Sequence, residues 1–366
     1  MARLRVAAAG PPRPSLGRQA LNSFPAFPDD SYSLLKKYLT RDVWAQLNPL
    51  RTRSGVSLQD CIHSGVTNVD SEVGLYAGDA DSYTVFTRLF APVIADCHPG
   101  FVIGAHRSEL VAAHVRPANP DPDGKYILST RMRVARNLRG YNLRPTTTSD
   151  EDLDVERKAK AAFKQLSGDL AGHYQVLAEM GVDGDSASAD GRLGFTRGDR
   201  FQDAAGLNRN WSIGRGFFSN QAKSFTAWVN EEDQLRLISV QRGADIATVF
   251  ARLCRAMDSI ENTLEFQRSD DYGFLCSCPT NLGTGLRASF HLRLPLSGGS
   301  QDFREICRRR YLTVRSSSGE HSPGAQYVYE ISNKRRLGLS EAEALHECLE
   351  GIMKLIALEK SFAARL

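Results

Sequence analysis

The sequence predicts an α+β protein: a small all-α N-terminal domain, followed by a larger domain with an antiparallel β-sheet flanked by α-helices. Three observations support this. Apolar residues recur at helical spacing in the first third of the chain, a proline-rich segment follows, and later stretches alternate apolar and polar side chains. A length of 366 residues with 42% hydrophobic content also favours two domains.

The helical domain is expected over residues 31–115. The segment 33–55 places Leu34, Leu35, Tyr38 and Leu39 on one helical face, and a second helical stretch spans residues 82–94. Between them, "HSGVTNVDSEVGLYAGD" is rich in glycine and predicts a loop. The run "RPANPDPDGK" at 116–125 contains three prolines and predicts a linker between the domains.

The second domain is expected over residues 126–366. Alternation predicts strands in "YILSTRMRVARNL" (126–138), "SFTAWVNEEDQLRLISVQ" (224–241) and "LRASFHLRLP" (286–295). The tight "NEED" turn within the second stretch indicates antiparallel pairing. Helices are expected at 151–180, 244–266 and 340–364, packed on the sheet.

Composition limits the classes of function. A charged fraction of 24% is ordinary for a globular protein, and no apolar run approaches the roughly 18 residues that a membrane span needs. Seven scattered cysteines show no spacing of a zinc site, so reduced thiols in a cytosol-like compartment are expected.

Residues 1–30 are expected to form a disordered N-terminal extension. The first 28 residues contain four arginines and no acid, a composition similar to a mitochondrial transit peptide. Pro11, Pro12 and Pro14 interrupt any long amphipathic helix there, which favours a plain unstructured extension. A cytoplasmic location is therefore expected, with a mitochondrial one as the alternative.

The stretch "LCSCPTNLGTGLRASFHLRL" at 275–294 raises the question of a binding loop. Gly283-Thr-Gly285-Leu-Arg-Ala288 matches a dinucleotide-loop pattern by letter, but it leads into a predicted strand instead of a helix. No Walker-type GxxxxGK[ST] motif occurs in the chain. A hairpin corner with solvated arginines remains as the simple alternative.

Arginines repeat on the non-core face of several predicted strands. Arg131 and Arg133 project from one face beside Ser129, and Arg236 shares a face with Glu232. Guanidinium groups bind phosphate oxygens bidentately and keep their charge, so converging arginines suit a polyphosphate. The acids nearby would suit a cationic partner. Further members of this set are Arg287 and His291 on the third strand, and Arg315, Glu320 and His321 in the Ser/Gly-rich segment 314–326.

Four motifs carry a resemblance to a known family. They are "STRMRVARNLRGY" (129–141), "WVNEEDQLRLIS" (228–239), "CPTNLGTGLRAS" (278–289) and "EISNKRRLGL" (330–339). Over residues 31–364 the chain resembles the phosphagen kinases (ATP:guanidino phosphotransferases), particularly those that act on arginine. The resemblance implies reversible transfer of the γ-phosphoryl group of ATP to the guanidino group of L-arginine, with Mg²⁺ held by the nucleotide and not by protein side chains.

The resemblance also implies roles for individual residues. It implies that the nucleotide phosphates are bound by Arg131, Arg133, Arg236, Arg287 and Arg315. It also implies that other parts of the nucleotide are contacted by Ser129, Arg192, His291 and Glu330. The substrate guanidinium would be bound by Glu232, Cys278, Thr280 and Glu320. The substrate carboxylate would be bound by the backbone amides of Ser64, Gly65 and Val66 in the glycine-rich loop. Glu232, Cys278, Glu320, Arg133 and Arg236 would be catalytic, with Cys278 acting as a thiolate.

Some positions depart from the family pattern. Cys97 stands where a tyrosine or an arginine is usual, which leaves other guanidino acceptors such as taurocyamine open; Arg192 and Ser318 also differ. Phosphorylation of arginine side chains in proteins, a nucleic-acid-binding protein and a catalytically silent relative are further alternatives. A net charge of only +4 and the acids within the arginine set disfavour nucleic acid. The family includes monomers and homodimers.

Overall fold

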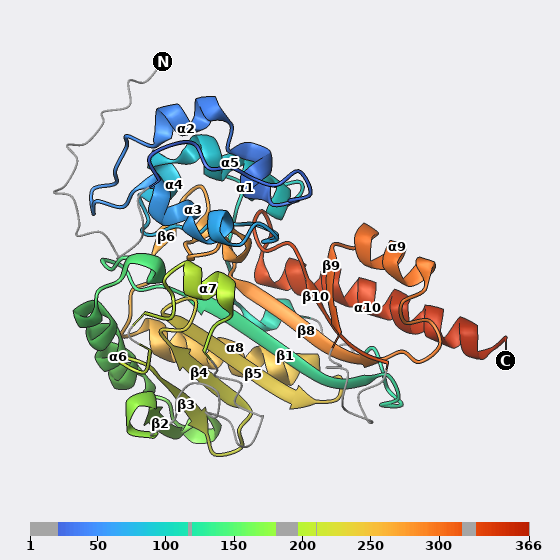
Figure 1. The fold of residues 1–366 in the computed structure, drawn as a ribbon. Helices are drawn as coiled ribbons and strands as arrows, with labels where there is room; N and C mark the ends of the chain where they lie inside the picture. The colour runs from blue at the N-terminus through green and yellow to red at the C-terminus, as the bar shows by residue number, and fades with distance from the viewer. Residues whose placement is uncertain (1–20, 116–118, 181–196, 210, 317–326, 366) are drawn as a thin grey trace.

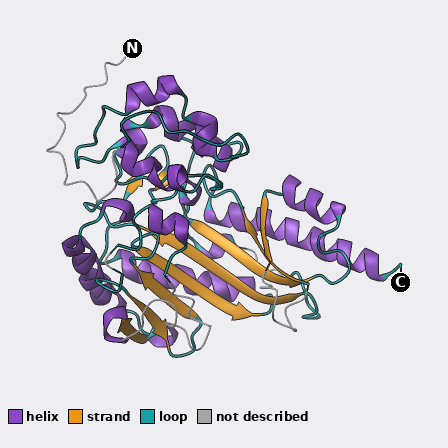
Figure 2. Ribbon diagram, viewed as in Figure 1, coloured by secondary structure: helices purple, strands orange, loops and turns teal. Residues whose placement is uncertain are grey.

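The computed structural model describes residues 21–115, 119–180, 197–209, 211–316 and 327–365. A helical N-terminal region lies against a larger region built on a β-sheet (Figure 1). Figure 2 shows most of the strands gathered into one large sheet, with helices above and beside it. This is the α+β architecture that the sequence predicted.

The N-terminal region contains short helices around its own apolar cluster, which includes Leu35, Trp44, Ile62 and Phe90. Ser57 caps the start of α3 in a capping box, in which Asp60 accepts a hydrogen bond from the Ser57 amide. The helices are α1 (Leu34–Tyr38), α2 (Arg41–Leu47), α3 (Leu58–Thr67), α4 (Ser82–Val85) and α5 (Thr87–Cys97).

The larger region contains an eight-stranded sheet in the order β2-β3-β4-β5-β1-β8-β10-β9, with antiparallel pairing throughout. Its strands are β1 (Ile127–Arg136), β2 (Gly172–Val176), β3 (Gly216–Asn220), β4 (Phe225–Val229), β5 (Leu235–Arg242), β8 (Leu286–Arg293), β9 (Leu312–Ser316) and β10 (Val328–Asn333). The β4–β5 hairpin contains the predicted turn at 230–233. A separate pair is formed by β6 (Arg268–Ser269) and β7 (Gly273–Phe274).

One face of the sheet carries the main core. Met132 and Val134 of β1 and Phe290 of β8 belong to one buried cluster with Phe250 of α8 and Leu345 of α10. These helices lie on one side of the sheet and leave the other side to face α7 and the N-terminal region (Figure 1). The helices of this region are α6 (Ser149–Phe163), α7 (Arg200–Ala204), α8 (Ile246–Glu261), α9 (Gln301–Arg309) and α10 (Glu341–Ala363).

Two sequence-based expectations about elements were wrong. The helix predicted over 151–180 ends at Phe163, and β2 occupies Gly172–Val176 because it pairs with β3, a partner that periodicity cannot reveal. The loop predicted around Ser64–Val66 is the C-terminal half of α3. The helices expected at 244–266 and 340–364 are present as α8 and α10.

The two regions share apolar contacts. The cluster of the N-terminal region also contains Leu143, Tyr272, Leu275, Leu282 and Leu337 from the larger region. Ala77 donates to the carbonyl of Ser277 at 2.8 Å, and Tyr83 Oη donates to the carbonyl of Cys276 at 2.6 Å. The division into domains at 116–125 remains a prediction.

Candidate active site

The strand register brings the predicted arginines to one face of the sheet. Arg133 of β1 lies directly opposite Arg287 of β8, and Arg236 of β5 lies opposite Ala135, two residues along β1 from Arg133. Arg315 of β9 lies opposite Glu330, which lies opposite His291. Directly opposed residues project to the same side of an antiparallel sheet. We call this set the arginine face: Arg131, Arg133, Arg236, Arg287 and Arg315.

Acidic partners hold some of these arginines in place. Arg236 forms ion pairs with Glu231 and Glu232, whose side chains are 11% and 13% exposed. Burial alone would lower the pKa of Arg236, but the carboxylates around it raise the pKa above the usual value. Conversely, burial would raise the pKa of Glu232, and Arg236 and Arg133 bring it below the usual value. Glu232 is therefore a charged carboxylate in this site.

The backbone of Arg133 pairs within the sheet, but its side chain has no hydrogen bond or ion pair to the described part of the chain. Burial, together with the charges of Arg236, Arg131 and Arg287, lowers the pKa of Arg133 well below its usual value. Such clustering of like charges is unfavourable without a counter-ion. The cluster of Arg133 with its neighbouring arginines is therefore suited to bind an anion.

The outer part of the face combines charge with hydroxyl and ring groups. Arg287 binds Glu330 at 3.0 Å and donates to Ser332 Oγ at 3.2 Å. Ser129 Oγ lies 2.8 Å from His291 Nδ1, which places these two predicted nucleotide contacts together. At this end of the face, hydroxyl, imidazole and carboxylate groups are available to a ligand.

Cys278 lies at a corner that Asp233 helps to fix. Asp233 accepts hydrogen bonds from the Ser277 amide at 2.9 Å and from Asn137 at 2.8 Å, and Pro279 begins a short 3₁₀ turn. Cys278 Sγ lies 3.1 Å from Thr280 Oγ1. Burial, and then the charge of Glu232, raises the pKa of the Cys278 thiol to about 12. Burial and Glu232 thus favour the neutral thiol of Cys278 in the free protein, and the thiolate expected from the sequence remains a prediction.

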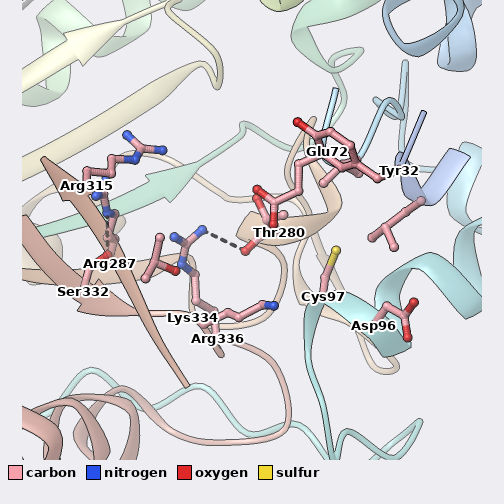
Figure 3. A pocket seen from close by; sticks show the side chains of 13 residues that line it. Tyr32, Glu72, Asp96, Cys97, Thr280, Arg287, Arg315, Ser332, Lys334 and Arg336 are labelled. Atoms are coloured by element: carbon pink, nitrogen blue, oxygen red, sulfur yellow. Dashed lines mark hydrogen bonds between the residues drawn. The ribbon is translucent and has the colours of Figure 1, made fainter. Parts of the chain in front are cut away.

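Two adjoining cavities connect these groups. The first, of about 330 Å³, contains Glu232, Cys278, Thr280, Arg133 and Arg287 in its wall. The second, of about 400 Å³, shares Thr280, Arg287 and Arg315 and reaches Cys97. Figure 3 shows the second cavity, with Cys97 and Glu72 from the N-terminal region facing Arg287, Arg315 and Arg336 from the sheet region. The predicted residues that line these cavities are Arg133, Glu232, Cys278, Thr280, Arg287 and Arg315. The walls of these two cavities do not include Ser129, Arg131, Arg236, His291 or Glu330.

The residues predicted for the substrate carboxylate need a correction. Ser64, Gly65 and Val66 lie within α3, where backbone amides are used by the helix, and Ser64 Oγ donates to the carbonyl of Phe201 at 2.6 Å. Gly65 is needed for packing, because a Cβ there would lie 2.4 Å from the carbonyl oxygen of Gly74. The cavity is lined instead by Ser71, Glu72, Val73, Gly74 and Tyr76 of the loop that follows.

Two further residues near the site were missed by sequence reasoning. Arg336 lines both cavities and donates to the carbonyl of Thr280 at 2.8 Å; burial lowers its pKa to about 10. His98 is fully buried, with Nε2 2.9 Å from the carbonyl of Pro279 and Nδ1 accepting from the Arg336 amide at 3.3 Å. Burial lowers the pKa of His98 to about 3, so a neutral imidazole joins the Cys278 corner to Arg336. These contacts of Arg336 and His98 join segments far apart in the sequence, so only the tertiary structure shows them.

Three predicted positions, Glu320, Arg192 and Ser318, lie outside the described residues. His321 does as well. Among the described residues, no group of three or more His, Cys, Asp or Glu side chains is placed to hold a metal ion. Glu231 and Glu232 are both engaged with Arg236, and a Mg²⁺ ion coordinated by nucleotide oxygens needs no such cluster.

An arginine-lined cavity beside a carboxylate and a thiol suits a phosphotransferase with an anionic donor and a cationic acceptor. Comparison with known proteins gives the family. Residues 154–362 match the C-terminal catalytic domain of ATP:guanido phosphotransferases, and residues 29–95 match their N-terminal domain. The chain belongs to the ATP:guanido phosphotransferase family, the phosphagen kinases.

Individual relatives agree with this assignment. An arginine kinase of Polybetes pythagoricus is 44% identical over 91% of this chain and 94% of its own length. An arginine kinase of Anthopleura japonica is 46% identical over 90% of this chain, which spans only 47% of that relative. Among solved structures, a lombricine kinase matches with a TM-score of 0.83 at 32% identity over 94% of this chain and 97% of its own. The duplicated taurocyamine kinase of Schistosoma mansoni matches with a TM-score of 0.82 at 33% identity. The match covers 91% of this chain and 47% of that chain.

Proposed function

We propose that this protein is an arginine kinase, which transfers the γ-phosphoryl group of Mg-ATP reversibly to L-arginine and so buffers cellular ATP. The observation that carries the proposal is that Arg133, Arg287 and Arg315 of the arginine face line one cavity together with Glu232 and Cys278. Arginine as the acceptor is supported by relatives named arginine kinase at 43–46% identity.

In this proposal the arginine face binds the phosphate chain. Arg133, Arg236 and Arg287 neutralise the charge of the group in transfer, because phosphoryl transfer depends mainly on positioning and electrostatic stabilisation. Mg²⁺, when bound with the nucleotide, would neutralise further charge on the phosphate oxygens. The rest of the nucleotide is contacted by Arg131, Arg315, Ser129, His291 and Glu330. A nucleotide contact by Arg192 is proposed from the sequence alone.

Glu232 is assigned to the acceptor guanidinium. A carboxylate cannot remove a guanidinium proton outright, since the pKa gap of roughly 9 units corresponds to about 12 kcal/mol. Glu232 therefore orients the nitrogen and accepts the proton as the P–N bond forms. Cys278 and Thr280 complete the contacts to the acceptor, and Glu320 is retained from the sequence as the second carboxylate. A bound cationic guanidinium would favour the thiolate of Cys278 by its charge.

The carboxylate end of the acceptor is assigned to the loop 71–76 instead of residues 64–66. Its chain is fixed by hydrogen bonds from Leu34 to the Glu72 carbonyl and from Leu35 to the Val73 carbonyl, both at 3.0 Å. Within the described part of the chain, the amides of Val73 and Gly74 donate to no backbone carbonyl, so they remain available to an anion.

Taurocyamine is the second candidate acceptor. It is favoured by the structural match to the taurocyamine kinase of Schistosoma mansoni and by Cys97, a small side chain in the wall of the second cavity. No helix among the described residues has the length and apolar character of a membrane span. A cytoplasmic location, a monomer or homodimer, and the lack of a nucleic-acid partner remain predictions.

A coupled assay of ADP release across guanidino compounds tests the proposal. L-arginine should give the highest kcat/KM among arginine, creatine, taurocyamine, glycocyamine and lombricine, each tested with Mg-ATP. A higher value for taurocyamine would replace the proposed acceptor. No turnover with any of them would reject the proposed function.

A further inference from the structure

Glu72 is an acidic residue in the cavity wall that the proposed mechanism does not use. It is exposed and lies in the walls of both cavities, beside Val73 and Thr280. In the described part of the chain its carboxylate has no hydrogen bond or ion pair. An exposed, unpartnered carboxylate in the wall of a substrate cavity is available to a cationic group of the ligand.

The backbone around Glu72 is fixed, so its side chain is presented from a defined position. The Glu72 carbonyl accepts from Leu34, and Tyr76 donates to the carbonyl of Cys61 at 2.9 Å. Gly74 packs on Gly65 of α3. Figure 3 shows Glu72 on the N-terminal side of the cavity, across from the arginines of the sheet region.

Other charges around the second cavity are largely engaged elsewhere. Arg287 binds Glu330, and Arg336 donates to Thr280 and Asn281. The acidic Asp96 binds Lys37 at 2.6 Å and Tyr38 at 2.8 Å. Two more cations, Arg315 and Lys334, line the same cavity without an ion pair to Glu72 within 4.0 Å. Of the two described acids that line this cavity, Glu72 and Asp96, Glu72 is thus the one that is free to meet a ligand.

We propose that Glu72 binds the α-ammonium group of L-arginine and is a specificity-determining residue. The proposal rests on the proposed function, which places the guanidinium at Glu232 and the other end of the acceptor at the loop 71–76. That end carries a carboxylate and an ammonium group on one carbon atom. The loop amides suit the carboxylate, and the Glu72 side chain suits the ammonium group.

This assignment gives Glu72 a selective effect. Glycocyamine has a carboxylate and taurocyamine a sulfonate, but neither has an ammonium group. Both would bring a negative charge near Glu72 without an ammonium group to pair with it, and like charges at short range discriminate against a ligand. Glu72 therefore favours a zwitterionic acceptor over a purely anionic one.

The test compares L-arginine with 5-guanidinopentanoate, which is arginine without its α-amino group. Wild-type protein should show a kcat/KM ratio of roughly three to ten in favour of arginine, the size expected of one exposed charge-assisted contact. In Glu72→Gln the ratio should fall to about one, and Glu72→Asp should keep part of it. Asp96→Asn is the matched control, since its carboxylate is bound to Lys37 and Tyr38, and the ratio should not change.

The outcomes separate the two proposals. Turnover of arginine with a ratio that Glu72→Gln leaves unchanged would overturn the role of Glu72 and keep the proposed function. Absence of phosphoarginine formation by wild-type protein would overturn both. An equal decrease in kcat/KM for both acceptors in Glu72→Gln would also overturn the proposed contact with the ammonium group. Such a result would show a general effect of the substitution on the loop.

Discussion

Arg133 of β1 and Arg287 of β8 lie directly opposite each other in the antiparallel sheet, on the face away from the core. Arg287 has Glu330 as a partner, whereas Arg133 has none among the described residues. Two guanidinium groups in this relation repel each other, and this repulsion contributes to the lowered pKa of Arg133. We therefore expect the binding of an anionic nucleotide to relieve an unfavourable charge interaction in the free protein.

Arg133→Met should stabilise the free protein and remove nucleotide binding. Loss of a clustered, partly buried charge should raise the free energy of unfolding by about 1 kcal/mol. Thermal unfolding with and without Mg-ADP measures both effects: wild-type protein should gain stability from Mg-ADP, and the variant should gain little. A variant that is less stable alone but equally stabilised by Mg-ADP would show that Arg133 has only a structural role.

Glu232→Gln should keep ADP binding while lowering kcat by about 100-fold or more, because orientation and proton acceptance are lost together. The amide retains the size of the side chain, so the cavity shape is preserved. Steady-state kinetics and ADP titration check the two parts. Undiminished phosphoarginine formation would remove Glu232 from the mechanism.

Alkylation of Cys278 should increase with pH over a high range. Its pKa is raised to about 12, so the reactive thiolate forms only as pH rises toward that value. The iodoacetamide rate constant at Cys278, measured by peptide mapping, should rise about ten-fold per pH unit between pH 8 and 10. A plateau below pH 8 would show that the free protein already contains a thiolate.

Gly65→Ala should displace the loop 71–76. The new Cβ would lie 2.4 Å from the Gly74 carbonyl oxygen, so the backbone of the loop must move, at a cost of about 1–3 kcal/mol. The KM for the guanidino acceptor should rise more than the KM for ATP. Gly351→Ala in α10 is the control, since its nearest contact is the flexible side chain of Leu312. Equal effects on both KM values would argue against a role of this loop in acceptor binding.

The arginine face could be predicted because alternation along a strand decides which side each residue takes. Arg131 and Arg133 are two residues apart, and the motifs around Arg236 and Arg287 show the same period. The pairing of β1 with both β5 and β8 could not be predicted, yet it is what brings these arginines together.

The acceptor loop shows where sequence reasoning failed. Two Ser-x-Val segments, Ser64–Val66 and Ser71–Val73, lie seven residues apart, and both occur in a glycine-rich stretch. Only tertiary structure separates them: the first belongs to a capped helix, and the second is hydrogen-bonded to α1 and lines the cavity. Arg336 was missed for a related reason, since its position depends on His98, 238 residues away in sequence.

The central claim, that this cleft transfers a phosphoryl group to a guanidino nitrogen, is tested most directly by ³¹P NMR of the protein with Mg-ATP and L-arginine. The spectrum should show ADP together with a phosphoramidate resonance from phosphoarginine. When ADP is added in excess, this resonance should decrease and the ATP resonances should return. A spectrum with unchanged ATP, or with inorganic phosphate in place of the phosphoramidate, would contradict the claim.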